Sequence, residues 1–109
     1  MNRDILFTNI KVWAEKEPYI HRCWAYGSLI KGGFSEVSSD IDIAIEMFRK
    51  PGDESFLPIW FECKKHLNDG LKAVTGENTH IEAIDDAKKG VVAKAVADHG
   101  ILIYEREIN

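Results

Sequence analysis

The residues with the clearest potential for chemistry are two aspartates separated by one residue, Asp40 and Asp42. The segment from Asp40 to Glu46 alternates isoleucine with polar or small residues, which is typical of a β-strand with one buried face. Side chains at positions i and i+2 of a strand share a face, with Cα atoms about 6.6 Å apart. Two carboxylates placed this way repel each other unless a cation lies between them, and Mg²⁺ prefers such oxygen ligands. The pair is a candidate magnesium site; the simpler alternative is a solvated strand face.

A glycine–serine pair, Gly27-Ser28, follows the aromatic-rich segment 21–26, which we predict to be a strand. Glycine allows the backbone to approach a phosphate closely, and free N–H groups at the start of a helix attract anions. An ordinary turn would have the same composition. A P-loop is excluded, because Gly33 and Phe34 stand where that motif needs lysine and then serine or threonine. The pair is therefore a candidate phosphate-binding turn of another kind.

The remaining periodicities predict the elements that position these residues. We expect helices over 4–17, 54–71 and 87–98, strands over 21–26, 40–46 and 80–84, and a strand or docked tail over 101–105. This order predicts a mixed α/β (α+β) fold, with a small mixed sheet and helices packed mainly on one face. A length of 109 residues predicts a single domain over 1–109.

Composition excludes several classes of protein. The chain has no apolar run long enough for a membrane helix and no secretory signal pattern at its start. A net charge of −4 argues against dedicated nucleic-acid binding. Cys23 and Cys63 are not in a C-x-x-C arrangement, and the histidines lack metal-ligand spacing. We therefore expect reduced cysteines and a cytoplasmic protein.

Taken together, the two motifs resemble a known signature. Tyr26-Gly27-Ser28, a short glycine-containing connection and then Ser39-Asp40-Ile41-Asp42 resemble the DNA polymerase beta-like nucleotidyltransferases. The short chain looks like a minimal nucleotidyltransferase of the MNT type. Downstream, the segment from His80 to Asp85 is similar to the strand that carries the third acid of the family. The segment from His99 to Tyr104 is similar to its terminal Gly-x-x-x-Tyr pattern.

The resemblance implies the nucleotidyltransferase fold and a role for each matching residue. Gly27 and Ser28 would contact the triphosphate, and Asp40 and Asp42 would bind Mg²⁺. Glu82 stands where the family usually has an aspartate, and would be the third catalytic and metal-binding carboxylate.

Lys31 and Glu82 depart from the residue types that the family usually has at their positions, and each has an alternative interpretation. Lys31 stands where many members have an arginine, and would contact a phosphate as a point charge; a solvated loop lysine is the alternative. A solvated strand carboxylate is the alternative for Glu82, and Asp85 is the fallback third acid, although a regular strand points it to the opposite face.

The implied activity is a magnesium-dependent transfer of a nucleoside monophosphate, AMP from ATP, to a hydroxyl acceptor. Short members of this type are often encoded beside a HEPN-domain protein. The resemblance therefore implies a HEPN-type partner, and in some cases an antitoxin that adenylylates a tyrosine of its toxin. Homo- and hetero-oligomers both stay open.

Two other interpretations compete with this activity. The first is a non-catalytic binding module of the same fold that neutralises or stabilises a partner by contact, using some of its many aromatic residues, namely Trp13, Trp24, Phe56, Trp60 and Phe61. The second is an enzyme that modifies a small molecule.

Overall fold

A computed structural model of the protein describes residues 3–27, 41–48, 52, 57–76, 79–84 and 90–107. The elements, in chain order, are α1 (Arg3–Glu15), β1 (Ile20–Tyr26), β2 (Ile41–Met47), α3 (Leu57–Thr75), β3 (Thr79–Ile84), α4 (Val91–His99) and β4 (Ile101–Glu105). The segment 101–105 is a strand and not merely a docked tail. α3 continues to Thr75, beyond its predicted end at residue 71, and the buried Thr75 hydroxyl donates to the carbonyl of Leu71 at 3.0 Å.

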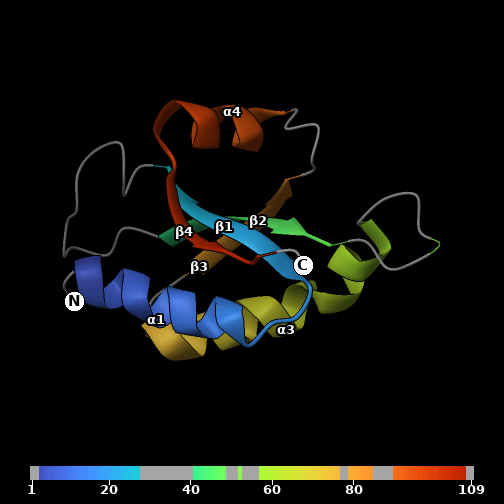
Figure 1. Ribbon diagram of the computed structural model, residues 1–109, viewed down its shortest axis with the longest axis horizontal. Coiled ribbons are helices and arrows are strands. Elements are labelled where there is room, and N and C mark those ends of the chain that lie inside the picture. Colours follow the sequence, from blue (N-terminus) through green and yellow to red (C-terminus); the bar gives the residue numbers. More distant parts are fainter. Residues whose placement is uncertain are drawn as a thin grey trace.

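The described strands form one mixed sheet in the order β3-β2-β1-β4 (Figure 1). β1 is antiparallel to both β2 and β4, whereas β2 and β3 are parallel. Parallel neighbours need a crossover connection, and α3 lies between β2 and β3 in the chain. The two central strands, β1 and β2, bring Gly27, which directly follows β1, and Asp42, near the start of β2, to neighbouring ends.

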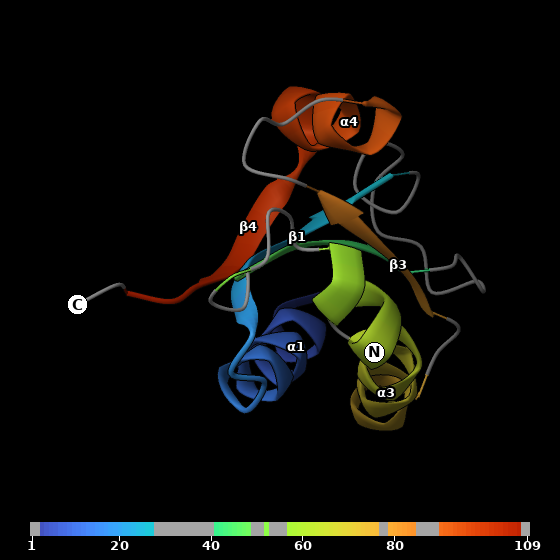
Figure 2. The ribbon, with the colours of Figure 1, turned by 90° about the vertical axis from the view of Figure 1, so that its right-hand side faces the viewer.

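Helices cover both faces of the sheet unequally. α1 and α3 lie side by side on one face, and α4 lies on the other (Figure 2). The larger core forms between the sheet and the helix pair, where Ile43 and Ile45 of β2 meet Ile10 of α1 and Leu71 of α3. These four side chains are fully buried. The prediction of a mixed α/β fold with helices mainly on one face is confirmed.

The opposite face of β2 is less polar than alternation alone suggests. Ala44 is 0% exposed and Glu46 is 4% exposed. Ala44 packs with Tyr26, Ile84 and Ala93, and Ala93 belongs to α4. The helix therefore covers the middle of this face and leaves Asp42 at its end partly exposed.

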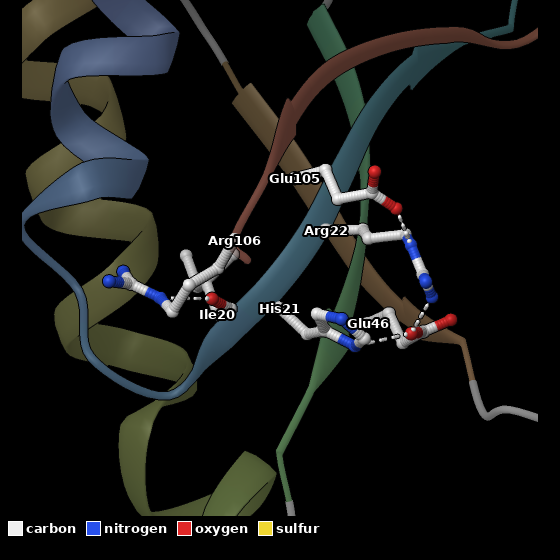
Figure 3. A network of polar contacts seen from close by, with 6 residues as sticks. All are labelled: Ile20, His21, Arg22, Glu46, Glu105 and Arg106. Atoms are coloured by element: carbon white, nitrogen blue, oxygen red, sulfur yellow. Dashed lines mark hydrogen bonds and ion pairs between the residues drawn. The ribbon is translucent and has the colours of Figure 1, made fainter. Parts of the chain in front are cut away.

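Glu46 is buried within a polar network that joins three strands (Figure 3). Arg22 donates from Nη1 to Glu46 at 2.5 Å and from Nε to Glu105, and His21 Nδ1 lies 2.9 Å from the same Glu46 oxygen. The hydrogen bond to Glu105 is the main cause of the raised pKa of Arg22, and the same bond lowers the pKa of Glu105. The network ties β1, β2 and β4 together at the end of β1 far from Gly27.

Within the described ranges, neither cysteine forms a disulfide and no helix is suited to a membrane. Cys23 and Cys63 are both free, and burial raises the pKa of the Cys23 thiol to about 12. Cys23 is thus a protonated core residue. None of the helices in the described ranges is long and apolar enough to cross a membrane.

Candidate active site

Gly27 and Asp42 meet where β1 ends and β2 begins. Tyr26, the last residue of β1, is the register partner of Asp42. Gly27 follows with a φ of 84°, in the left-handed region that glycine adopts without strain. A Cβ atom built on Gly27 would stand 2.4 Å from Oδ2 of Asp42. Both the positive φ and the close approach of Asp42 therefore require glycine at position 27. The Asp42 carboxylate lies directly against the turn.

β3 adds two polar side chains on the same face. His80 is the register partner of Asp42, and Glu82 is the partner of Ala44. The His80 ring lies between the two acids: Nε2 is 2.9 Å from Glu82 Oε1, and Nδ1 is 4.0 Å from Asp42 Oδ1. Glu82 therefore lies diagonally across from Asp42 on the neighbouring strand, with a histidine that orients its carboxylate.

The Tyr26 phenol lies near enough to both acids for their charges to affect its pKa. Its pKa is raised to about 12, first by burial and then by the negative charges of Asp42 and Glu82. The phenol therefore keeps its proton at neutral pH and can donate a hydrogen bond. Our interpretation of the sequence used Tyr26 only as part of a motif and gave His80 no role. Their place in the site follows from strand pairing, because Tyr26 and His80 are both register partners of Asp42.

α4 contributes a further side chain, that of its last residue, His99. The Gly27 N–H donates to Nε2 of His99 at 3.0 Å. This contact joins residues 72 positions apart in the chain. In this structure the amide hydrogen of Gly27 is therefore already engaged by a side chain.

The other predicted site residues, Ser28, Lys31, Asp40 and the fallback Asp85, lie outside the described residues. Within the described ranges, no three histidine, cysteine, aspartate or glutamate side chains are grouped closely enough to hold a metal ion. The two candidate ligands that are described, Asp42 and Glu82, are carboxylates, the donors that suit Mg²⁺. The donor chemistry at the turn therefore fits this cation, with Asp42 as the described ligand nearest the glycine.

An open pocket of about 430 Å³ borders this site at the β3 edge. Its walls come from α3 and β3, and the lining residues are Phe61, Lys64, Lys65, Asn68, Thr79, His80 and Ile81. His80 belongs both to this pocket and to the acidic face. Phe61 is 73% exposed, so the pocket presents an aromatic ring to solvent.

Several solved structures share this fold. A mutant of the toxin–antitoxin complex MntA-HpeT matches with a TM-score of 0.59 and 17% identity, over 98% of this chain and 76% of that chain. A toxin–antitoxin structure with AMP-PNP matches with a TM-score of 0.57 and 17% identity, over 98% and 76%. The complex MntA-HepT matches with a TM-score of 0.54 and 16% identity, over 96% and 74%. At this level of identity the likeness shows the fold.

The sequence itself identifies the family. No curated protein matches the chain. Residues 8–109, however, match the family described as "Polymerase beta, Nucleotidyltransferase". This match spans nearly the whole chain and includes the three strands of the site, so the chain belongs to the polymerase beta nucleotidyltransferase family.

Proposed function

We propose that this protein is a magnesium-dependent nucleotidyltransferase that transfers AMP from ATP to a hydroxyl group of a partner protein. The observation that carries the proposal is the Asp42 carboxylate packed against the Gly27 turn, with Glu82 on the same face of the next strand. Family membership supports the reaction class. The choice of ATP, magnesium and a protein acceptor is our proposal.

Each residue has a distinct role in this proposal. Asp40 and Asp42 hold Mg²⁺, with Glu82 as the third ligand, and the ion when bound neutralises charge on the phosphates and aligns the reacting oxygens. Gly27 brings the backbone close to the triphosphate, and Ser28 and Lys31 contact its outer phosphates.

The transfer exchanges one bond to phosphorus for another. The acceptor hydroxyl oxygen forms a bond to the α-phosphorus of ATP, and the bond from that phosphorus to the β-phosphate oxygen breaks. Pyrophosphate leaves with this electron pair, and the hydroxyl proton passes to the Glu82 carboxylate. His80 holds that carboxylate in place by its 2.9 Å contact. Positioning and charge neutralisation supply most of the rate in such reactions.

For the acceptor, we propose a tyrosine of a HEPN-type toxin, which makes this protein an antitoxin. Support comes from the solved structures of the same fold, which are toxin–antitoxin complexes, one of them with AMP-PNP. The cytoplasmic location, the single domain over 1–109 and a hetero-oligomer with the toxin stay predictions.

The decisive experiment incubates the protein with the product of the neighbouring gene, α-labelled ATP and Mg²⁺. We expect label on the partner, loss of label with EDTA, and loss of label in Asp42→Asn. Asp69→Asn is the matched control, because Asp69 is an exposed aspartate on α3, across the sheet from the site, and pairs with the exposed Lys65 of the same helix. Undiminished transfer by Asp42→Asn would overturn the proposal.

One observation favours the alternative of a non-catalytic binding module, namely the exposed Phe61 beside an open pocket. The other aromatic candidates lend it less support: Trp13 and Trp60 are buried, Trp24 is partly buried, and Phe56 lies outside the described residues. If Phe61→Ser abolishes partner binding while Asp42→Asn neutralises the partner normally, contact alone is the function. Val91→Ser is the control, since Val91 is 87% exposed on α4. Label on a small molecule and not on protein would select the small-molecule enzyme instead.

A further inference from the structure

The structure assigns His99 the role of a positioning residue, whose ring holds the Gly27 turn in the shape that receives the nucleotide. This inference rests on the proposed function for its nucleotide. Its structural part stands on the 3.0 Å hydrogen bond from Gly27 N–H to His99 Nε2. Neither the family match nor the fold neighbours assign a role to His99.

Gly27 lies beyond the last residue of β1 that pairs with β4, so no strand partner holds it on that side. On the β4 side, the last register pairs of β1 are Trp24 with Leu102 and Ala25 with Ile101. Continuing this antiparallel register by two residues would place Gly27 opposite His99. His99 is the last residue of α4, however, and not part of a strand. Its ring nitrogen therefore accepts the hydrogen bond that a backbone carbonyl would otherwise accept.

The hydrogen bond to His99 restricts the backbone of Gly27. Glycine has more backbone freedom than any other residue, and ordering it costs more entropy. A change in the Gly27 torsions would move the chain relative to Asp42, whose Oδ2 atom lies only 2.4 Å from the position of a Gly27 Cβ. The His99 contact thus holds the glycine beside the Asp42 carboxylate.

Gly100 explains how His99 reaches this place. A Cβ on Gly100 would stand 2.6 Å from the carbonyl oxygen of Val96 and 2.8 Å from its Cα. The Gly100 N–H donates to that same oxygen at 2.8 Å. Because Gly100 has no side chain, the backbone can leave α4 and enter β4 within this one residue. His99 therefore lies at the junction of α4 and β4, beside the end of β1. The His99-Gly100 pair therefore belongs to the site, although it lies far from the two signature motifs.

The contact also defines the side chains that can replace His99. The Nε2 atom accepts, so the ring carries its proton on Nδ1. Glutamine can place its amide oxygen near the position of Nε2 and keep the hydrogen bond. Phenylalanine keeps the ring shape but has no acceptor. Comparing His99→Gln with His99→Phe therefore separates the hydrogen bond from simple packing.

The experiment measures Mg-ATP binding by calorimetry for the parent protein, His99→Phe, His99→Gln and Asp42→Asn. Loss of one such hydrogen bond predicts roughly three- to tenfold weaker binding in His99→Phe. His99→Gln should stay within about twofold of the parent protein. In the transfer assay His99→Phe should raise KM for ATP by a similar factor and change kcat little, since the acceptor and Glu82 are untouched. If His99→Phe does not fold, His99→Asn, whose amide is too short to reach, takes its place.

A second readout does not depend on nucleotide. In ¹H–¹⁵N spectra the Gly27 amide should shift upfield and exchange faster in His99→Phe, but not in His99→Gln. If the parent protein binds no ATP, the proposed function fails and this amide signal decides whether His99 positions the turn. Unchanged ATP affinity in His99→Phe would overturn the inference. Tighter binding would also overturn it, because the ring would then compete with the phosphate for the Gly27 amide.

Discussion

Asp42 and Gly27 approach so closely that a single methyl group on the glycine would collide with the carboxylate, at 2.4 Å from Oδ2. Asp42 belongs to β2 and Gly27 directly follows β1, the antiparallel neighbour of β2, so their contact follows from the register of Tyr26 with Asp42. This relationship places a metal-binding type of side chain beside a turn suited to phosphate.

The first prediction concerns Gly27→Ala. A left-handed backbone costs a non-glycine residue about 1–2 kcal/mol, and the new methyl group would also displace Asp42. We expect a lower melting temperature together with loss of AMP transfer, measured by thermal unfolding and the labelling assay. Gly76→Ala is the control, because Gly76 also has a positive φ of 70°, but a Cβ added there would meet no described atom within 4 Å. It should lose stability and keep activity. Equal activity in both variants would contradict a special role for Gly27.

The second prediction concerns His80. The ring orients Glu82 through a 2.9 Å contact, and partners of this kind typically contribute 10–100-fold to metal affinity or activity. We expect His80→Phe to lower the rate of AMP transfer by about 10- to 100-fold without unfolding the protein. His66→Phe is the matched control, since His66 makes a similar 3.1 Å contact with Glu17 on the other side of the sheet. A His80→Phe protein as active as His66→Phe would remove His80 from the site.

The third prediction concerns alkaline pH. In the unfolded chain the Cys23 thiol and the Tyr26 phenol have pKa values of 9.0 and 10.0, whereas in the folded protein both pKa values are raised to about 12. Between these values the unfolded state binds fewer protons, so the free energy of unfolding falls as pH rises. Well below pH 9.0 this contribution is constant. Urea unfolding from neutral to alkaline pH checks the trend, and Tyr26→Phe and Cys23→Ala should each flatten it. The same slope in all three proteins would refute this assignment.

The fourth prediction concerns the network at the far end of the sheet. Glu46 is 4% exposed and accepts from Arg22, and its Oε2 atom has no hydrogen-bond partner among the described residues. Replacing the carboxylate by an amide in Glu46→Gln weakens the charged contacts, with an expected loss of about 1–3 kcal/mol in the free energy of unfolding. Chemical denaturation measures it, with Glu15→Gln on the exposed face of α1 as control. Nucleotide binding should be retained, because the network is remote from Gly27.

The sequence by itself determined the elements and the chemistry of the two motifs. Isoleucine alternation identified β2 and placed Asp42 on the face opposite the core, because strand geometry has a period of two. The sequence also predicted the strand over 80–84 that carries Glu82, and β1 ends at Tyr26, directly before Gly27, as predicted. These features are local, so the residues involved carry their own signal.

Only the tertiary structure decided what those side chains meet. Strand pairing brought His80 opposite Asp42, and the packing of α4 buried Ala44 and turned a predicted polar face partly apolar. The contact of Gly27 with His99 spans 72 positions and depends on the register of β1 with β4 and on the sharp exit from α4 at Gly100. No local pattern encodes such a contact, because register and helix placement result from the packing of the whole core.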